Sequence, residues 1–240
     1  MTQIDQVIDA MRNNGGYATF DQLNQSVDFS SWKTKTPQAS VRRIVQVNDA
    51  FFRIQPGLWA LVEYKNEVLK KFKIEDNDEK KQESFTHSYY QGLLVKTGNS
   101  IGYQTYIPNQ DKGRLFLEKP LGEISTVDKI FDFSYPDIVR RAKTIDTIWF
   151  NERNMPHSFF EVEHSTDIQN SLTKYYELQD FAAGFYIVAP QHRKKQYDDV
   201  ISRSIFRSIK NRVKFISYDD VASRQERTAE IEIFEERLMR

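Results

Sequence analysis

Several features are missing from this 240-residue sequence, and each absence excludes a class of protein. It has no cysteine, which rules out disulfide bonds and zinc sites with thiolate ligands. No apolar run approaches the roughly 20 residues that a membrane-spanning helix needs, so we expect no membrane association. The opening MTQIDQVIDAMRNNGG is acidic and amphipathic, unlike the basic and then apolar pattern of a signal peptide. A cytoplasmic protein is the simplest interpretation.

Excess charge of one sign is also missing, because 34 basic residues balance 34 acidic ones. The sequence contains no G-x-S-x-G, P-loop or GxGxxG motif, so nothing supports a serine hydrolase, a nucleotide hydrolase or a dinucleotide enzyme. The histidines are scattered without the spacing of zinc ligands: His87, His157, His164 and His192.

Basic residues nevertheless gather in two segments, at residues 30–53 and 191–214. Local basic patches on a neutral protein are compatible with DNA binding. Solvated helix faces have the same composition, so either segment taken alone leaves both interpretations open.

The first 64 residues predict a small domain of helices followed by a hairpin. TQIDQVIDAMRN carries apolar residues at helical spacing, and Gly15 and Gly16 end that helix. YATFDQLNQSV predicts a second helix capped by Thr19, and TPQASVRRIVQVND a third with Pro37 in its first turn. FFRI, QPGL and WALVEY predict strand, turn and strand. This order is that of a winged helix.

The segments GGYATFDQL, TPQASVRRI and FFRIQPGLWAL resemble winged helix-turn-helix modules of the HARE-HTH kind. The resemblance implies that the third helix enters the major groove of DNA. The candidate DNA-binding residues are Lys33, Lys35, Gln38, Ser40, Arg42 and Arg43. Arginine and glutamine can read guanine and adenine edges. The alternative is that this small domain packs against a protein.

Residues 65–83 are densely charged, and EDNDEKKQE within them is the best linker candidate. We therefore expect a winged-helix domain at 1–64, a linker at 65–83 and a second domain at 84–240. In the second domain, helical patterns alternate with short apolar strands, which predicts a mixed α/β sheet covered by helices. QHRKKQYDDVISRSIFRSI, within residues 191–214, is expected to form a basic helix.

Acidic residues interrupt two of the predicted strands. In SFFEVEHS, strand alternation sends Phe160 and Val162 to one face and Glu161 and Glu163 to the other, roughly 7 Å apart at the backbone. In TIDTIWF, Asp146 lies among apolar residues, an unusual context for a surface charge. If the two strands pair as a hairpin across NERNMPH, Asp146 approaches Glu161. Clustered carboxylates repel one another, so they call for a cation or a raised pKa.

Asp146 followed by Glu161-Val162-Glu163 resembles the motif of the PD-(D/E)XK nucleases, and FEVEHST resembles their restriction-endonuclease members. The resemblance covers about residues 85–218. It implies a restriction-endonuclease-like mixed sheet flanked by helices, with Asp146, Glu161 and Glu163 catalytic. It also implies Mg²⁺, or Mn²⁺ in its place, held by Asp146 and Glu161. The literal Pro136-Asp137 dipeptide instead reads as the start of a helix.

One position departs from the family pattern, since Glu163 stands where a lysine is usual. Lysine would stabilise developing negative charge, whereas glutamate would bind metal or act as a base. Lys174, on the following predicted helix, could supply the cation, and a solvated lysine is its alternative. Candidate accessory residues also include His87 and Gln91, which share a helix face at i and i+4 in the helix that borders the active site of such folds.

The resulting hypothesis is a metal-dependent endonuclease of a restriction or defence system, acting on double-stranded DNA. Two-strand cleavage with one active site per chain implies a homodimer, and a companion methyltransferase is a candidate partner. The alternative is a catalytically inactive DNA-binding regulator or modified-DNA sensor on a degenerate nuclease fold.

Overall fold

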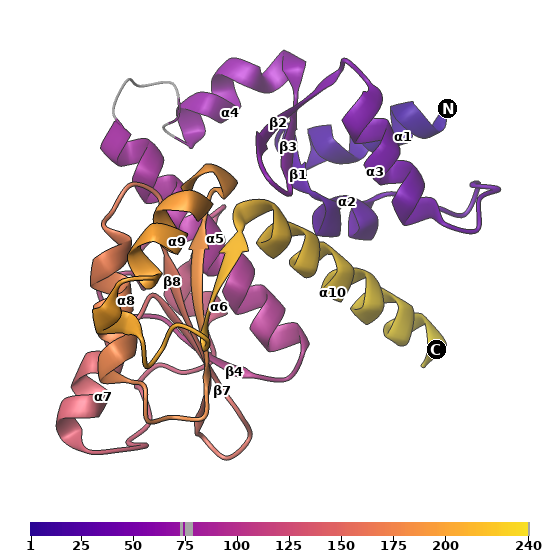
Figure 1. Ribbon diagram of the computed structural model, residues 1–240. Coiled ribbons are helices and arrows are strands. Elements are labelled where there is room, and N and C mark those ends of the chain that lie inside the picture. The colour runs from indigo at the N-terminus through magenta and orange to yellow at the C-terminus, as the bar shows by residue number, and fades with distance from the viewer. Residues whose placement is uncertain (73, 75–78, 240) are drawn as a thin grey trace. The chain divides into compact units, whose positions relative to one another are not determined.

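The computed structural model describes residues 1–72, 74 and 79–239 (Figure 1). Contacts within the chain divide it into two compact units, one of Met1–Lys81 with Glu226–Arg240 and one of Gln82–Gln225. The domain boundaries expected at 64 and 83 remain a prediction, because compactness alone does not say where a functional module ends.

The first unit begins with the helices and the hairpin that the sequence predicts. Its elements are α1 (Gln3–Asn13), β1 (Tyr17–Thr19), α2 (Phe20–Ser26), α3 (Pro37–Val47), β2 (Phe51–Gln55) and β3 (Leu58–Leu61). The short strand β1 pairs antiparallel with β3, and β3 pairs with β2. The sequence had assigned β1 to the second helix, which instead starts at Phe20 with Thr19 as its N-cap.

Capping and apolar spacing explain these elements. Thr2 and Thr19 each exchange hydrogen bonds with the third residue of the helix that follows, which satisfies backbone groups at the helix start. Gly16, with φ +85°, makes the turn after α1, and a Cβ there would lie 2.3 Å from the Tyr64 ring. The buried core of this unit includes Val7, Met11, Leu23, Val41, Val45, Phe51 and Leu61.

The predicted linker is described only in part. A 3₁₀ turn at Val62–Tyr64 leads into α4 (Lys65–Lys71), and α5 (Glu79–Ser100) begins inside the same segment. Residues 73 and 75–78, which belong to the linker prediction, lie outside the described residues.

The second unit is built on a mixed sheet with the order β10-β9-β8-β7-β4. The strands β4 (Gln104–Tyr106), β7 (Thr147–Phe150) and β8 (Pro156–Val162) pair antiparallel, and β8, β9 (Gly184–Ala189) and β10 (Val213–Ser217) pair in parallel. The remaining elements are the β5 (Leu115–Phe116) and β6 (Lys119–Pro120) hairpin, α6 (Leu121–Ile124), α7 (Pro136–Ala142), α8 (Ile168–Glu177), α9 (Lys194–Ile201) and α10 (Tyr218–Leu238). The residues of α10 from Glu226 onward belong to the first unit.

Helices cover both faces of this sheet (Figure 1). On one face α5 packs against Trp149, whose indole Nε1 donates to the Leu94 carbonyl oxygen at 3.1 Å. On the other face Ile148, Phe159 and Phe185 share one apolar core with residues of α7, α8 and α9. The fold is therefore a mixed α/β sheet flanked by helices, as predicted, and is consistent with a restriction-endonuclease-like fold.

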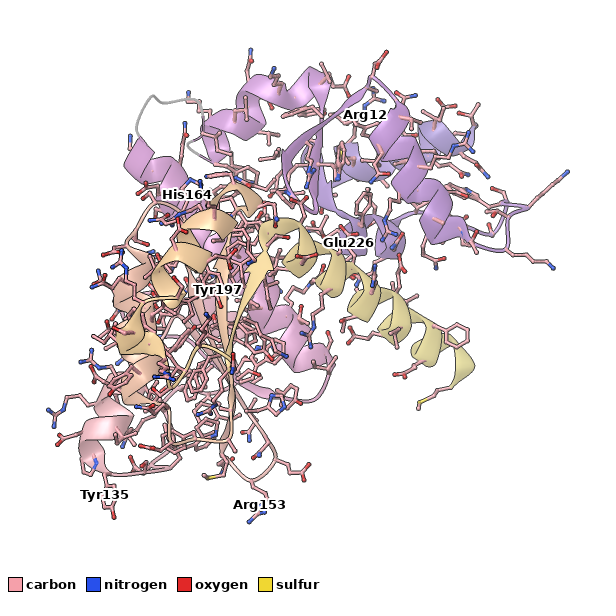
Figure 2. The ribbon with its side chains drawn as sticks, in the orientation of Figure 1. Arg12, Tyr135, Arg153, His164, Tyr197 and Glu226 are labelled. Atoms are coloured by element: carbon pink, nitrogen blue, oxygen red, sulfur yellow. The ribbon has the colours of Figure 1, made fainter. Side chains whose placement is uncertain are left out.

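The basic segment after β9 departs from its prediction, which was a single long helix. It forms a 3₁₀ turn (Gln191–Arg193), α9, and a second 3₁₀ turn (Ser204–Phe206). Arg203 is extended (φ −63°, ψ 145°), so α9 ends at Ile201. The hydroxyl of Tyr197, labelled in Figure 2, donates to the Val213 carbonyl oxygen at 2.9 Å and ties α9 to β10. Within the described part of the chain, no helix is long and apolar enough to cross a membrane.

Candidate active site

Asp146 lies immediately before β7, at the end where β7 and β8 pair. Thr147 is paired with Phe160, so Asp146 stands beside Glu161, as the predicted hairpin required. Its Oδ2 accepts a hydrogen bond from the Val162 backbone N–H at 2.7 Å. Its backbone oxygen accepts another from the Gln91 Nε2 at 2.8 Å. Both ends of the residue are therefore held by neighbouring elements.

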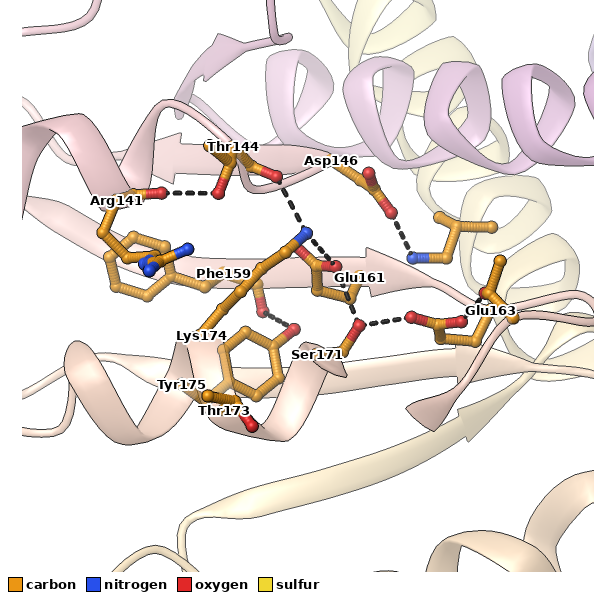
Figure 3. Close-up of polar contacts among 12 residues, drawn as sticks. Arg141, Thr144, Asp146, Phe159, Glu161, Glu163, Ser171, Thr173, Lys174 and Tyr175 are labelled. Atoms are coloured by element: carbon orange, nitrogen blue, oxygen red, sulfur yellow. Dashed lines mark hydrogen bonds and ion pairs between the residues drawn. The ribbon is translucent and has the colours of Figure 1, made fainter. Parts of the chain in front are cut away.

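Glu161 is 2% exposed and faces α8 from the middle of the sheet. Its two carboxylate oxygens lie 3.0 and 2.8 Å from the Lys174 Nζ, which also donates to the Thr144 carbonyl oxygen at 3.0 Å (Figure 3). Phe160, the preceding residue, packs on Trp149 at the opposite face, so the alternation predicted for this strand is confirmed. Lys174 is thus brought to Glu161 by the helix that follows the strand.

Glu163 follows β8 directly and is 5% exposed. The Ser171 hydroxyl of α8 bridges it to Glu161, at 2.9 Å from the Glu161 Oε2, and Thr166 also contacts Glu163 (Figure 3). A hydroxyl group carries one proton, so both Ser171 contacts are hydrogen bonds only if one carboxyl group is itself protonated. The geometry therefore favours a proton held within this pair.

The electrostatics agree with that geometry. Burial, followed by the charge of Asp146, raises the pKa of Glu161 to about 8, even though Lys174 opposes the shift. Burial raises the pKa of Glu163 to about 7 against the hydrogen bond from Ser171. Burial would lower the pKa of Lys174, but Glu161 outweighs it, so this pKa is raised and Lys174 stays charged.

The other side of Asp146 faces α5 and the loop after β4. The Nε2 of His87 lies 3.6 Å from the Asp146 Oδ1 and 4.0 Å from an oxygen of Asp111. Burial would raise the pKa of Asp146, but His87 and the Val162 hydrogen bond outweigh it, so this pKa is lowered. Gln91 donates to the Asp111 Oδ2 at 3.1 Å as well as to Asp146. The structure therefore gathers both candidate accessory residues of α5 at the acids.

Two residues at this site were missed from the sequence. Asp111 lies in an irregular loop with no periodic pattern to mark it, and Ser171 looks like an ordinary helix residue. A signal did exist for Ser171, because it stands three residues before Lys174 and the two share a helix face.

The structure also shows how exposed the remaining candidate residues are. Asp137 occupies the first turn of α7 with 85% of its side chain exposed and pairs with Arg140, so it is not part of the acid cluster. Of the candidate DNA-binding residues, Lys33, Lys35 and Arg43 are exposed, whereas Gln38, Ser40 and Arg42 are half-buried. Arg42 forms ion pairs with Glu226 and Glu230, both at 3.0 Å.

These features define a class of protein: a helix-flanked mixed α/β sheet, consistent with a restriction-endonuclease-like fold, with buried acids and a lysine at the paired ends of two strands. Residues 68–239 match the family model of the type II restriction enzyme NmeDI C-terminal domain, and the chain belongs to this family.

A curated relative is the type II restriction enzyme NmeDI of Neisseria meningitidis serogroup C, 28% identical over 115 residues. The matched region is 43% of this chain and 32% of that protein, so the chain spans about a third of the relative's length. No solved structure gives a significant match.

Proposed function

We propose that this protein is a metal-dependent endonuclease that hydrolyses phosphodiester bonds in double-stranded DNA, as a restriction or defence enzyme. Its family supports this proposal, and so does a PD-(D/E)XK-like arrangement of Asp146, Glu161 and Glu163. The observation that carries it is the ion pair between Lys174 and Glu161. It puts a charged amine beside the acids although the motif position itself holds Glu163.

The acids fit a divalent metal ion. Glu161 is a buried carboxylate and Asp146 a half-buried one beside it, and the charge of Asp146 contributes to the raised pKa of Glu161. Such repulsion is relieved by a cation with hard oxygen ligands, for which Mg²⁺ is suited and Mn²⁺ is a substitute. Asp146 and Glu161 would hold the ion. When bound, it would polarise the phosphodiester and lower the pKa of water.

The chain's own residues supply the other functions. Glu163, with a pKa near neutrality, would accept a proton from the attacking water. Lys174 would stabilise negative charge that develops on the phosphate. Ser171 would fix the positions of the two glutamate side chains relative to each other through its hydroxyl group.

A cleavage assay tests this function. Methylated and unmethylated plasmid DNA would be incubated with the protein and Mg²⁺ or Mn²⁺, beside Glu161→Ala and the exposed matched control Asp137→Asn. We expect discrete fragments from the wild type and from Asp137→Asn, and none from Glu161→Ala. Intact DNA under every condition would overturn the proposal.

DNA binding by the first unit extends the proposal. The order of helices and hairpin there supports a winged helix of the HARE-HTH kind, with α3 entering the major groove and Arg43 among the contacting residues. Two-strand cleavage would need two chains, so we propose a homodimer, and a companion methyltransferase would protect host DNA.

One observation favours a second candidate function, a catalytically inactive DNA-binding regulator or modified-DNA sensor. It is the glutamate at position 163, where active relatives of the motif usually carry lysine. In that case DNA would bind equally well in chelator, and Glu161→Ala would leave the binding unchanged.

A further inference from the structure

A second group of metal-ligating side chains surrounds the side of Asp146 that faces away from Glu161. His87 from α5, Asp111 from the loop after β4, and Asp146 each present one ligand atom, and these three atoms lie within 4.8 Å of one another. An octahedral ion with ligands about 2.1 Å away separates neighbouring ligand atoms by about 3 Å and opposite ones by about 4 Å. The three groups are therefore close to a coordinating arrangement.

The carboxylate oxygens of Glu161 face Lys174 and Ser171, whereas one Asp146 oxygen is directed toward this second group. Both oxygens of Glu161 are contacted by Lys174, and one also by Ser171. Asp146 uses Oδ2 for the Val162 N–H, and its Oδ1 is 3.6 Å from His87. Figure 3 shows this second oxygen of Asp146 turned away from Glu161 and Lys174.

Gln91 provides an independent indication of a ligand. Its side chain is fully buried, and its Nε2 donates to the Asp111 Oδ2 at 3.1 Å and to the Asp146 carbonyl oxygen at 2.8 Å. Its Oε1, on the same amide group, has no hydrogen-bond partner among the described residues. A buried amide oxygen costs free energy unless a donor or a cation satisfies it. Water on a bound ion would be such a donor.

The surroundings limit how an ion could bind. The side chain of Asp111 is 4% exposed, and its Oδ1 pairs with the Arg114 Nε at 3.1 Å. Its Oδ2, which accepts the hydrogen bond from Gln91, keeps a second lone pair for a ligand. The side chains of His87 and Asp146 are 21% and 13% exposed, so the group is reachable from solvent. Three protein ligands would leave further coordination positions for water or for a phosphate oxygen.

We propose that His87, Asp111 and Asp146 form a divalent-cation site that shares Asp146 with the catalytic acids and prefers Mn²⁺ to Mg²⁺. The preference follows from His87, since imidazole nitrogen suits transition metals whereas Mg²⁺ favours oxygen ligands and water. This inference rests on the proposed nuclease function and deepens it, because it adds a cation of a stated class on the other side of the shared Asp146. It needs no DNA to be tested.

The test is calorimetric titration of the DNA-free full chain with MnCl₂ and separately with MgCl₂, in mildly alkaline buffer. We expect Asp111→Asn and His87→Gln to weaken Mn²⁺ binding at least about tenfold, the scale of lost metal-site interactions. The exposed His192→Gln is the matched control and should bind as the wild type does. Unchanged Mn²⁺ binding in Asp111→Asn and His87→Gln would overturn the proposal, as would absence of Mn²⁺ binding to the wild type.

A variant that should keep the site but change its metal preference guards against effects of misfolding. His87→Asp replaces the nitrogen ligand with an oxygen, so it should keep a site but lose the Mn²⁺ preference; a retained preference would count against the role of His87. Circular dichroism would show whether each variant is folded.

The two proposals fail separately. Loss of Mn²⁺ binding in Asp111→Asn together with intact plasmid for the wild type would reject the nuclease and keep the site. DNA cleavage by the wild type with unaltered Mn²⁺ binding in Asp111→Asn would keep the nuclease proposal and reject the metal site.

Discussion

At the scale of single residues, the site depends on how charge is compensated around Glu161. This carboxyl group is almost fully buried, and Lys174 is its cationic neighbour at 2.8 Å. Breaking a buried ion pair by removing one member leaves an uncompensated charge or forces a protonation. The pair therefore contributes to stability as well as to the proposed chemistry.

Lys174→Met should lower the free energy of unfolding by about 1–3 kcal/mol, because Glu161 then loses its charged partner. Urea denaturation would measure the loss, and Lys195→Met, at an exposed position, is the control that should change little. Adding Glu161→Gln to Lys174→Met should recover part of the loss, since the buried carboxyl group that lost its partner is then also removed. Equal stability of the Lys174 and Lys195 variants would contradict this account.

Glu163 should make stability depend on pH. Its pKa is raised in the folded chain from 4.5 to about 7, so the folded state holds its proton more tightly than the unfolded state does. This contribution to stability is fully present below pH 4.5 and is lost as the pH rises through about 7. In chelator, the wild type should therefore lose stability relative to Glu163→Gln across this range. Parallel pH profiles from thermal unfolding would contradict the assignment.

At the scale of elements, α5 is the support for the site because it carries His87 and Gln91 on the face that packs on the sheet. Gly92, the next residue, has no room for a side chain, since a Cβ there would lie 2.1 Å from the Phe116 ring. Close packing of α5 against the β5–β6 hairpin is thus part of what positions the two accessory residues.

Gly92→Ala should destabilise the chain by about 1–3 kcal/mol through overpacking against Phe116, even though alanine favours helices. Thermal or urea unfolding would measure it. Gly102→Ala is the comparison for lack of space, since nothing lies near its Cβ, although its φ of +84° adds backbone strain. A stabilised Gly92→Ala would show that Phe116 moves aside without cost.

The helix α3 presents two neighbouring arginines in different settings. Arg42 pairs with Glu226 and Glu230 of α10 and lies over the Phe20 ring, whereas Arg43 is exposed. Burial is the largest cause of the raised pKa of Glu226, and Arg42 opposes it. Arg42 is therefore committed to the fold of the first unit more than Arg43 is.

Arg43→Ala should weaken DNA binding without affecting stability, because it removes one phosphate- or base-contacting charge. Arg42→Ala should instead lower stability, by about 1–2 kcal/mol, since it leaves the partly buried Glu226 unpaired. Gel shifts at several salt concentrations and urea denaturation separate the two effects. A destabilised Arg43→Ala, or a stable Arg42→Ala, would contradict this distinction.

At the scale of the whole molecule, the part of the chain that matches the family is the part that contains the mixed sheet and its acids. The family match begins at residue 68 and therefore covers the second unit and α10, whereas the winged-helix interpretation concerns the residues before it. If the first unit binds DNA as proposed, recognition and chemistry would belong to different parts of the chain. Each chain would then contribute one active site.

The proposed homodimer predicts a measurable mass. Sedimentation of the full chain with a DNA duplex should give a complex that contains two chains, and cleavage of both strands should depend on protein concentration. A complex with one chain that still cuts both strands would reject the dimer.

The sequence alone determined the longer strands, most helices and the acids, because these depend on local periodicity, whereas the short strands β1, β5 and β6 were not predicted. Strand alternation has a period of two, so the side of the sheet that Glu161 faces could be inferred from its neighbours. The prediction of one long basic helix was wrong, since apolar spacing did not reveal the extended backbone at Arg203. The helix α10 was not predicted.

Only the tertiary structure decided which residues meet the acids. Gln91 contacts Asp111 and Asp146 across 20 and 55 positions of the chain, and Lys174 reaches Glu161 across 13. No local pattern encodes such pairings, because they depend on how α5 and α8 pack on opposite faces of the sheet. The sequence thus determined the acids and their strand faces, and folding determined their cation and the ligands around Asp146.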